Sequence, residues 1–208
     1  MFAVRASLAA RASPALQITG YPLIPASTVA ASATAGAPRR SAAKPTADFD
    51  YVTDLVCDEA ALAVGLGALR RGAPVVADAS TVEAGITGYP VICKAGDSLA
   101  ARLSRTANIT VSAAAVRLAF SAAGPGAVWL VGCAPAALAE IMAREVEPAL
   151  VIGVPVGFAG AAEAKDALRR SGLPALSNVS EKGGPAVAVA ALEALLRMAQ
   201  DPEEDAHA

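Results

Sequence analysis

The sequence predicts an α/β protein with an open, mostly parallel sheet of about five strands and helices on both faces. Short apolar runs alternate with helical patterns from residue 48 onward, and turn residues separate the two kinds of segment. The apolar runs do not alternate with polar residues, which is typical of strands buried on both faces. A chain of 208 residues, of which 55% are hydrophobic, is long enough for one such domain.

Each predicted strand is a run of four or five mostly apolar residues bounded by turn residues. The runs cover residues 74–77, 90–93, 127–131, 149–153 and 174–178. Helices are predicted between them, with Asp58, Asp97 and Thr110 or Ser112 at three helix starts. Further helices are predicted after Gly132, over about 161–170, and from the 180–184 loop to about Met198. Parallel strands joined by helices follow from this order.

The two ends of the chain differ from this middle part. Residues 1–45 contain arginines and a lysine but no Asp or Glu, and they show no persistent hydrophobic period. Such a composition can mark an organelle transit peptide, but several prolines interrupt any long helix, and a loose segment is the interpretation that we favour. We therefore divide the chain into a poorly patterned segment (1–45), an α/β domain (46–199) and an acidic tail (200–208).

Composition excludes several classes of protein. A formal net charge of −2 without a basic cluster argues against a nucleic-acid binder. No apolar stretch reaches the length of a membrane-spanning helix, which predicts a soluble protein that does not associate with a membrane. The cysteines, Cys57, Cys93 and Cys133, are odd in number and widely spaced, so they predict neither a metal cluster nor a disulfide framework, only buried thiols in a reducing cytoplasm.

Histidine chemistry is also restricted. The only histidine, His207, lies in the acidic tail. A Ser/His/Asp or Cys/His arrangement would require this tail to fold back onto the domain, which terminal charged segments rarely do.

Four loops follow predicted strands and are candidate ligand sites, because ligands of such sheets bind beyond the carboxyl ends of the strands. They cover residues 78–85, 132–136, 155–160 and 180–184. Glycines and helix N-termini in these loops suit a carboxylate or phosphate ligand. The G-x-G-x-x-G spacing of a dinucleotide site is missing.

Each of these features also has a purely structural interpretation. Gly157 and Gly160 can serve tight strand-to-helix packing, and the 182–184 turn can be a solvated surface turn. A structural thiol is favoured for Cys133, because no base is near in the sequence. Glu163 and Lys165, two residues apart on a predicted helix, are expected to point to solvent or to a partner chain.

Three segments resemble the precorrin-8X methylmutase family. They are P-A-L-V-I-G-V-P-V-G-F-A-G-A-A-E-A-K at 148–165, K-G-G-P-A-V-A at 182–188 and T-A-D-F-D-Y at 46–51, and G-C-A-P-A-A-L at 132–138 is similar to a fourth family motif. The likeness covers about residues 46–198. It implies a cytoplasmic, homodimeric isomerase of cobalamin biosynthesis. Such an enzyme moves a methyl group from C-11 to C-12 of precorrin-8X, or of its cobalt form, without a cofactor or a bound metal.

The resemblance also implies the site residues. The family has a histidine, thought to act as an acid on a ring nitrogen, at the position nearest to Lys44, which makes Lys44 the expected catalytic residue. A lysine is a weak acid at neutral pH and needs desolvation to donate a proton readily. The residues expected to bind the tetrapyrrole are Asp78, Thr81, Thr110, Cys133, Phe158, Lys182, Gly183 and Gly184.

Several family positions are altered in this chain, among them those of Thr81, Val111 and Cys133. Two hypotheses follow. The chain is an active methylmutase that relies on ring positioning and electrostatic preorganisation, or it is a catalytically impaired relative that binds a tetrapyrrole or acts as a structural partner. A nucleotide-binding oxidoreductase of the same layer architecture is disfavoured by the missing glycine motif.

Overall fold

The computed structural model describes residues 33–144 and 146–200, which form one α/β layer structure. A six-stranded sheet has the order β1-β6-β5-β4-β2-β3, in which all pairs are parallel except β1 with β6. The strands are β1 (Leu55–Cys57), β2 (Val75–Ala77), β3 (Val91–Cys93), β4 (Val128–Val131), β5 (Leu150–Gly153) and β6 (Ala175–Asn178). The predicted fold class is thus confirmed, with one antiparallel strand more than expected.

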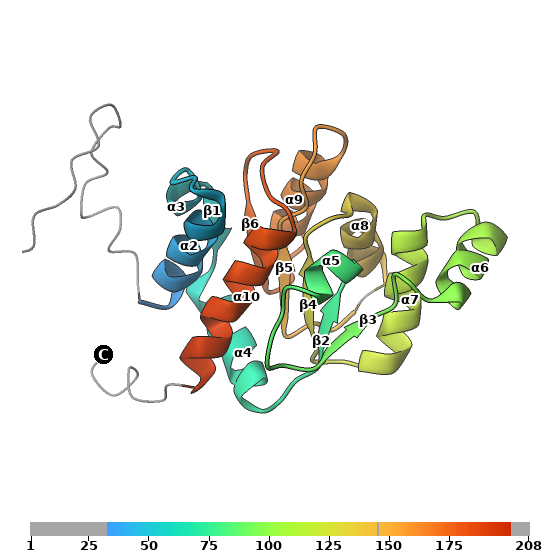
Figure 1. The fold of residues 1–208 in the computed structure, drawn as a ribbon, viewed down its shortest axis with the longest axis horizontal. Coiled ribbons are helices and arrows are strands. Elements are labelled where there is room, and N and C mark those ends of the chain that lie inside the picture. The colour runs from blue at the N-terminus through green and yellow to red at the C-terminus, as the bar shows by residue number, and fades with distance from the viewer. Residues whose placement is uncertain (1–32, 145, 201–208) are drawn as a thin grey trace, which may run out of the picture.

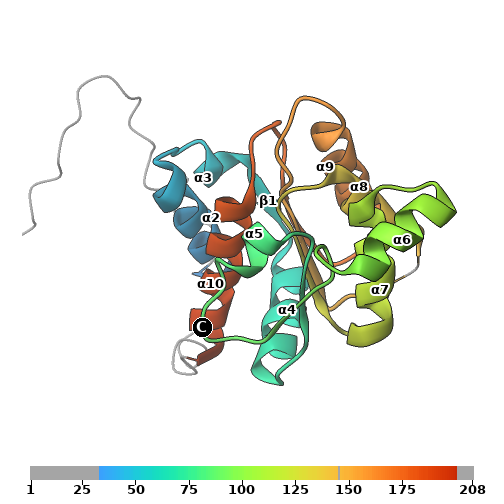
Figure 2. The same cartoon turned by 45° about the vertical axis from the view of Figure 1, so that its right-hand side comes forward.

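Helices cover both faces of the sheet, as Figure 1 shows. On one face lie α2 (Ala33–Thr46), α4 (Glu59–Arg70), α5 (Ser80–Glu83) and α10 (Pro185–Gln200); on the other lie α7 (Val111–Ala123), α8 (Pro135–Ala143) and α9 (Ala161–Arg170). The short α3 (Tyr51–Asp54) precedes β1, and α6 (Ser98–Ala107) packs on α7 to form a hairpin at one end of the molecule (Figure 2).

Successive side chains along each strand point to opposite faces of the sheet, so the core has one part on each face. In β4, Val128 and Leu130 face the α4 and α10 side, whereas Trp129 and Val131 face α7 and α8, and all four are at most 1% exposed. Because both faces are covered, the central strands need apolar side chains at every position. This explains why they appear in the sequence as unbroken apolar runs.

Three predicted helix starts are confirmed by their hydrogen bonds. The carboxylates of Asp58 and Asp97 accept from the backbone N–H two residues later, and Thr110 Oγ1 accepts from Ala113 N at 3.1 Å. These are N-cap geometries, which satisfy backbone donors at a helix start. Of the two alternatives for α7, Thr110 is therefore the cap.

The segment before residue 46 differs from the expectation of a loose region. Residues 33–46 form α2, even though Pro38 and Pro45 lie inside the helix. The helix packs along α10, where Ala42 is fully buried. We interpret this packing as the gain that outweighs the backbone hydrogen bonds the prolines cannot make. Residues 1–32 and 201–208, including His207, lie outside the described residues.

Candidate functional site

The predicted ligand loops follow β2, β4, β5 and β6, so they all lie at the carboxyl edge of the parallel part of the sheet. In Figure 1 this edge runs along the upper side of the sheet, with the loops before α5, α8, α9 and α10. The loops after β2 and β4 form one contacting pair, and the loops after β5 and β6 form another. Both pairs meet at the start of α10.

The first pair is organised by Asp78. Its carboxylate accepts hydrogen bonds from the backbone N–H groups of Gly132 (3.1 Å), Cys133 (2.9 Å) and Ala134 (2.8 Å). Asp78 is only 5% exposed, and burial raises the pKa of its carboxyl group although the three donors favour the charged form. Asp78 therefore fixes the turn before α8 from inside.

Two further predicted residues meet on top of this turn. Thr81 Oγ1 and Cys133 Sγ are 3.4 Å apart. Burial raises the pKa of the Cys133 thiol, and the described residues place no histidine beside it, so the structure offers no activation of this thiol as a nucleophile. The Thr81 and Cys133 side chains form a small polar surface at the edge.

The second pair of loops is held together by backbone hydrogen bonds. Gly184 N donates to Val154 O at 2.8 Å, and Gly157 N donates to Glu181 O at 3.2 Å. Gly183 has φ +149°, and a Cβ built on it would lie 2.2 Å from the Val154 oxygen. Only glycine allows the two backbones to approach so closely.

Gly132 connects the two pairs. A Cβ at Gly132 would lie 3.0 Å from Pro185 Cα and 3.1 Å from Ala188 Cβ, both in the first turn of α10. Since Pro185 directly follows Gly184, the Cys133 turn and the 182–184 turn are neighbours. The structure thus brings Thr81, Cys133, Gly183 and Gly184 to one region of the edge.

Lys182 links this region to the segment after α2. Its Nζ donates to Asp48 Oδ2 at 2.7 Å and to Asp50 Oδ2 at 2.6 Å, and these two bonds raise the pKa of Lys182 above its usual range. The hydrogen bond from Lys182 also lowers the pKa of Asp48. The side chain that was expected to hold a substrate anion is therefore paired with two carboxylates of the protein itself.

A buried network lies beneath the same loop, and its central residue was missed in the sequence. Lys165 of α9 is fully buried; its Nζ donates to Asn178 Oδ1 at 3.0 Å, to the Lys182 carbonyl at 2.7 Å and to the Ser180 carbonyl. The expectation that Lys165 points to solvent or to a partner is wrong, whereas Glu163 is exposed. The spacing of Ala161, Lys165 and Leu168 places Lys165 on the buried face of α9, and this signal was available in the sequence.

Asp54, at the end of α3, completes the network from the other side. It accepts from Asn178 Nδ2 (2.8 Å), Val179 N (3.0 Å), Ser180 N (2.9 Å) and Ser180 Oγ (2.6 Å). Burial opposes its charge, but these donors lower its pKa on balance. Asp54, Asn178 and Lys165 together hold the backbone of the loop after β6.

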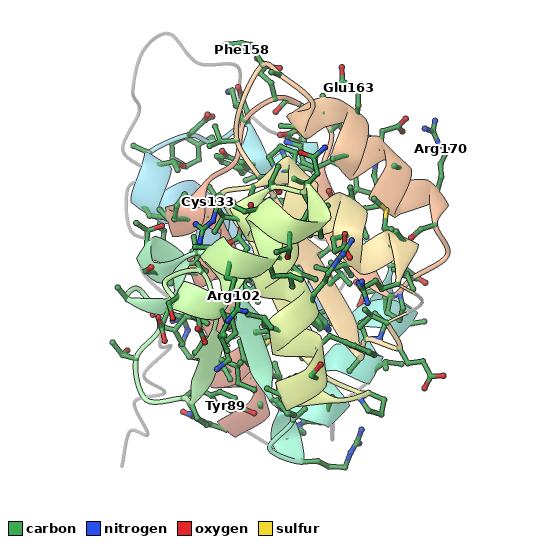
Figure 3. All side chains as sticks on the ribbon, turned by 90° about the vertical axis from the view of Figure 1, so that its right-hand side faces the viewer. Tyr89, Arg102, Cys133, Phe158, Glu163 and Arg170 are labelled. Carbon is green, nitrogen blue, oxygen red and sulfur yellow. The ribbon has the colours of Figure 1, made fainter. Side chains whose placement is uncertain are left out.

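The remaining predicted residues lie further out. Phe158 is 93% exposed at the tip of the loop after β5, where Figure 3 shows it projecting from the molecule. Thr110 caps α7 beyond β3, at the opposite end of the sheet from β6. Lys44 is exposed near the end of α2 and lines a groove of about 550 Å³ together with Ser41, Pro45, Ala186, Val189, Ala190, Glu193 and Arg197.

This groove begins beside the loop region. Ala186 and Val189 belong to the first turns of α10, and a Cβ at Gly85 would lie 2.8 Å from Val189 Cγ2.

Among the described residues, no group of three or more His, Cys, Asp or Glu is placed to hold a metal ion. In the same part of the chain, no helix is long and apolar enough to cross a membrane.

The sequence matches the family model described as precorrin-8X methylmutase over residues 23–198. The chain belongs to the precorrin-8X methylmutase family. Among curated members, it is 37% identical over 158 residues to the cobalt-precorrin-8 methylmutase of Salmonella typhimurium, covering 73% of this chain and 75% of that protein. It is 40% identical over 142 residues to the precorrin-8X methylmutase of a Sinorhizobium species, covering 62% of this chain and 67% of that protein.

The fold agrees with this membership. The structure of the precorrin-8X methylmutase from Thermus thermophilus superposes with a TM-score of 0.74 at 31% identity, covering 83% of this chain and 89% of that one. The family match extends upstream of residue 46. It therefore includes α2, which the sequence patterns alone did not reveal.

Proposed function

We propose that the chain is a methylmutase that moves the methyl group at C-11 of precorrin-8X, or of its cobalt form, to C-12 during cobalamin biosynthesis. Family membership supports an isomerase of this class. The observation that carries the proposal is the pair of glycine loops, 154–158 and 180–184, hydrogen-bonded to each other at the carboxyl edge of the sheet. Loops fixed in this way can position a flat, rigid ring.

The reaction places few demands on side-chain chemistry. The methyl group leaves C-11 and bonds to C-12 of the same molecule while the ring double bonds rearrange, so no group is transferred to the protein and nothing is oxidised or reduced. Positioning and electrostatic preorganisation can then supply much of the rate enhancement. This demand agrees with a site of backbone groups, glycines and few titratable side chains.

We propose Lys44 as the acid that donates a proton to a ring nitrogen before the methyl shift and takes a proton back after it, so that substrate and product carry the same number of protons. It lines the groove beside the first turns of α10, close to the 182–184 turn that we propose as a substrate contact.

We assign direct substrate contacts to Thr81, Cys133, Phe158 and the backbone of the 182–184 turn. Asp78 would act indirectly, by holding the Cys133 turn, and Thr110 by fixing the start of α7. Among the described residues, Phe158 is the most exposed large apolar side chain, which suits it to cover a bound macrocycle.

We further propose that the protein works as a homodimer in the cytoplasm, as is implied by its resemblance to the family. Sedimentation of the purified protein tests the oligomeric state. A mass of one chain at micromolar concentration would contradict the dimer.

The test of activity is to mix the purified protein with precorrin-8X and to follow the visible spectrum. We expect conversion to a corrin chromophore, and we expect replacement of Lys44 by Met to slow it. A spectral shift without turnover would show binding alone and would contradict the proposed reaction. No spectral change with folded protein would contradict both binding and catalysis.

A further inference from the structure

The Lys165 network has properties that space filling does not explain. A lysine that is fully buried pays a large desolvation cost, which an apolar side chain of similar length would avoid. Its Nζ has three acceptors, and two of them are main-chain carbonyls of the same loop, those of Ser180 and Lys182. The ammonium group thus stabilises a loop conformation rather than a contact between helices.

The Lys182 carbonyl is held from two sides. It accepts from Lys165 Nζ at 2.7 Å and from Asn178 Nδ2 at 2.9 Å. The next two residues are Gly183 and Gly184, which have φ values of +149° and +123° and depend on their surroundings for a fixed conformation. The two donors therefore orient the Lys182 carbonyl, which belongs to the peptide group directly before Gly183.

The charges around Lys165 come from three sides. Asp54 reaches it through Asn178, Glu181 lies in the loop, and Arg169 lies one turn further along α9 and donates to the Asn178 carbonyl at 2.5 Å. Burial is the largest influence on the ammonium group, and it lowers the pKa of Lys165 to about 8. At neutral pH the group is therefore charged and keeps all three of its donors.

We infer that Lys165 is a positioning residue, which acts through the main chain of residues 180–184 to hold the substrate-binding turn in the conformation that accepts the ring. The inference rests on the proposed function for the identity of the ring. That Lys165 stabilises the conformation of the 180–184 loop does not depend on that function. Lys165 touches no reacting atom in this scheme, and its contribution reaches the substrate through the Lys182, Gly183 and Gly184 backbone.

The test compares Lys165→Met with the unaltered protein. Met has similar length and is apolar, so a residue that only filled space would be replaced without loss of loop order. We expect amide exchange at Gly184 to accelerate about tenfold or more, because charge-assisted hydrogen bonds are lost, while exchange at Val128 in β4 stays the same. We also expect KM for precorrin-8X to rise about tenfold or more, with a smaller change in kcat.

Arg170→Met is the matched control on the same helix. The Arg170 side chain is 72% exposed and forms an ion pair with Asp166 of the same helix, away from the 180–184 loop, so neither exchange at Gly184 nor KM should change. Lys165→Arg keeps a buried charge and donors, and we expect it to restore part of the loop protection. If Lys165→Met does not fold, the Lys165→Arg protein still provides the comparison, with partial loop protection expected.

The outcomes separate this inference from the proposed function. Unchanged exchange and unchanged KM in a folded Lys165→Met protein would overturn the inference and leave the function intact. A Lys165→Arg protein whose Gly184 amide exchanges faster than in the unaltered protein while its KM stays native would overturn it as well, because the order of the loop would then not affect substrate binding. Faster exchange at Gly184 in a chain that never converts precorrin-8X would support the holding of the loop and contradict the function.

Discussion

Replacing Gly183 by alanine tests whether the close approach of the two loops is a real constraint. The new Cβ would lie 2.2 Å from the Val154 oxygen and 2.9 Å from the Pro155 oxygen. Both are main-chain atoms, so no side chain can rotate away. A carbon–oxygen contact is normally no shorter than about 3.3 Å, so the loop would have to move by about 1 Å.

The cost has two parts. A non-glycine residue at such a φ is strained by about 1 to 3 kcal/mol. Moving the turn also lengthens the hydrogen bond from Gly184 N to the Val154 carbonyl, which contributes about 1 kcal/mol. We therefore expect Gly183→Ala to lower the free energy of unfolding by about 2 to 4 kcal/mol.

Urea unfolding measures this change, and Gly172→Ala is the control. Gly172 also has a positive φ, +77°, but its added Cβ would meet no atom within 4 Å. That variant should show only the conformational cost of about 1 to 2 kcal/mol. Equal losses in the two variants would refute the reasoning, because the contact with the Val154 carbonyl would then contribute nothing.

Three other predictions concern the Asp78 carboxylate at the start of α8, the proposed acid Lys44 and the titration of Lys165. Asp78→Ala leaves three backbone donors at the start of α8 without their acceptor, so urea unfolding should show a free energy of unfolding lower by about 2 to 3 kcal/mol. The control is Asp58→Ala at the exposed start of α4, for which we expect a loss of about 1 kcal/mol. Lys44→His should raise turnover of precorrin-8X near neutral pH, because imidazolium is the stronger acid; unchanged turnover would mean that an acid at this position does not limit the rate. Because burial lowers the pKa of Lys165 to about 8, the folded protein releases this proton before the unfolded chain does. The free energy of unfolding should therefore rise between about pH 8 and about pH 10, by up to about 3 kcal/mol relative to Lys165→Met, and parallel pH curves for the two proteins would contradict this.

The parallel part of the sheet could be predicted because its signal is local. Each of β2 to β5 is a short apolar run that ends at a polar residue, a glycine or a turn, and β6 begins as one before Ser177 and Asn178. The sixth strand, β1, could not be found in this way. It has only three residues, Leu55–Cys57, and it is a strand because it pairs with residues 176–178, more than a hundred positions away.

The candidate site was predicted unevenly for a similar reason. The four loops that carry glycines and helix starts could be placed from the order of the strands. Two residues predicted from these loops, Thr81 and Cys133, are in contact. The roles of charged residues could not, because they depend on distant partners. Lys182 looked like a free cation but pairs with Asp48 and Asp50. The spacing along α9 indicated that Lys165 is buried, but not what it binds, because its acceptors lie outside α9.

The antiparallel strand β1 has a consequence for the order in which the molecule is made. It places Asp54 beside Ser180, 126 positions later in the chain. Asp54 also accepts a hydrogen bond from Asn178, which in turn accepts one from Lys165. During synthesis on the ribosome, Asp54 emerges early. Its carboxylate can form these hydrogen bonds only after most of the domain, up to Ser180, has been synthesised. A chain that stops before β6 lacks these donors, so it cannot present the finished turn.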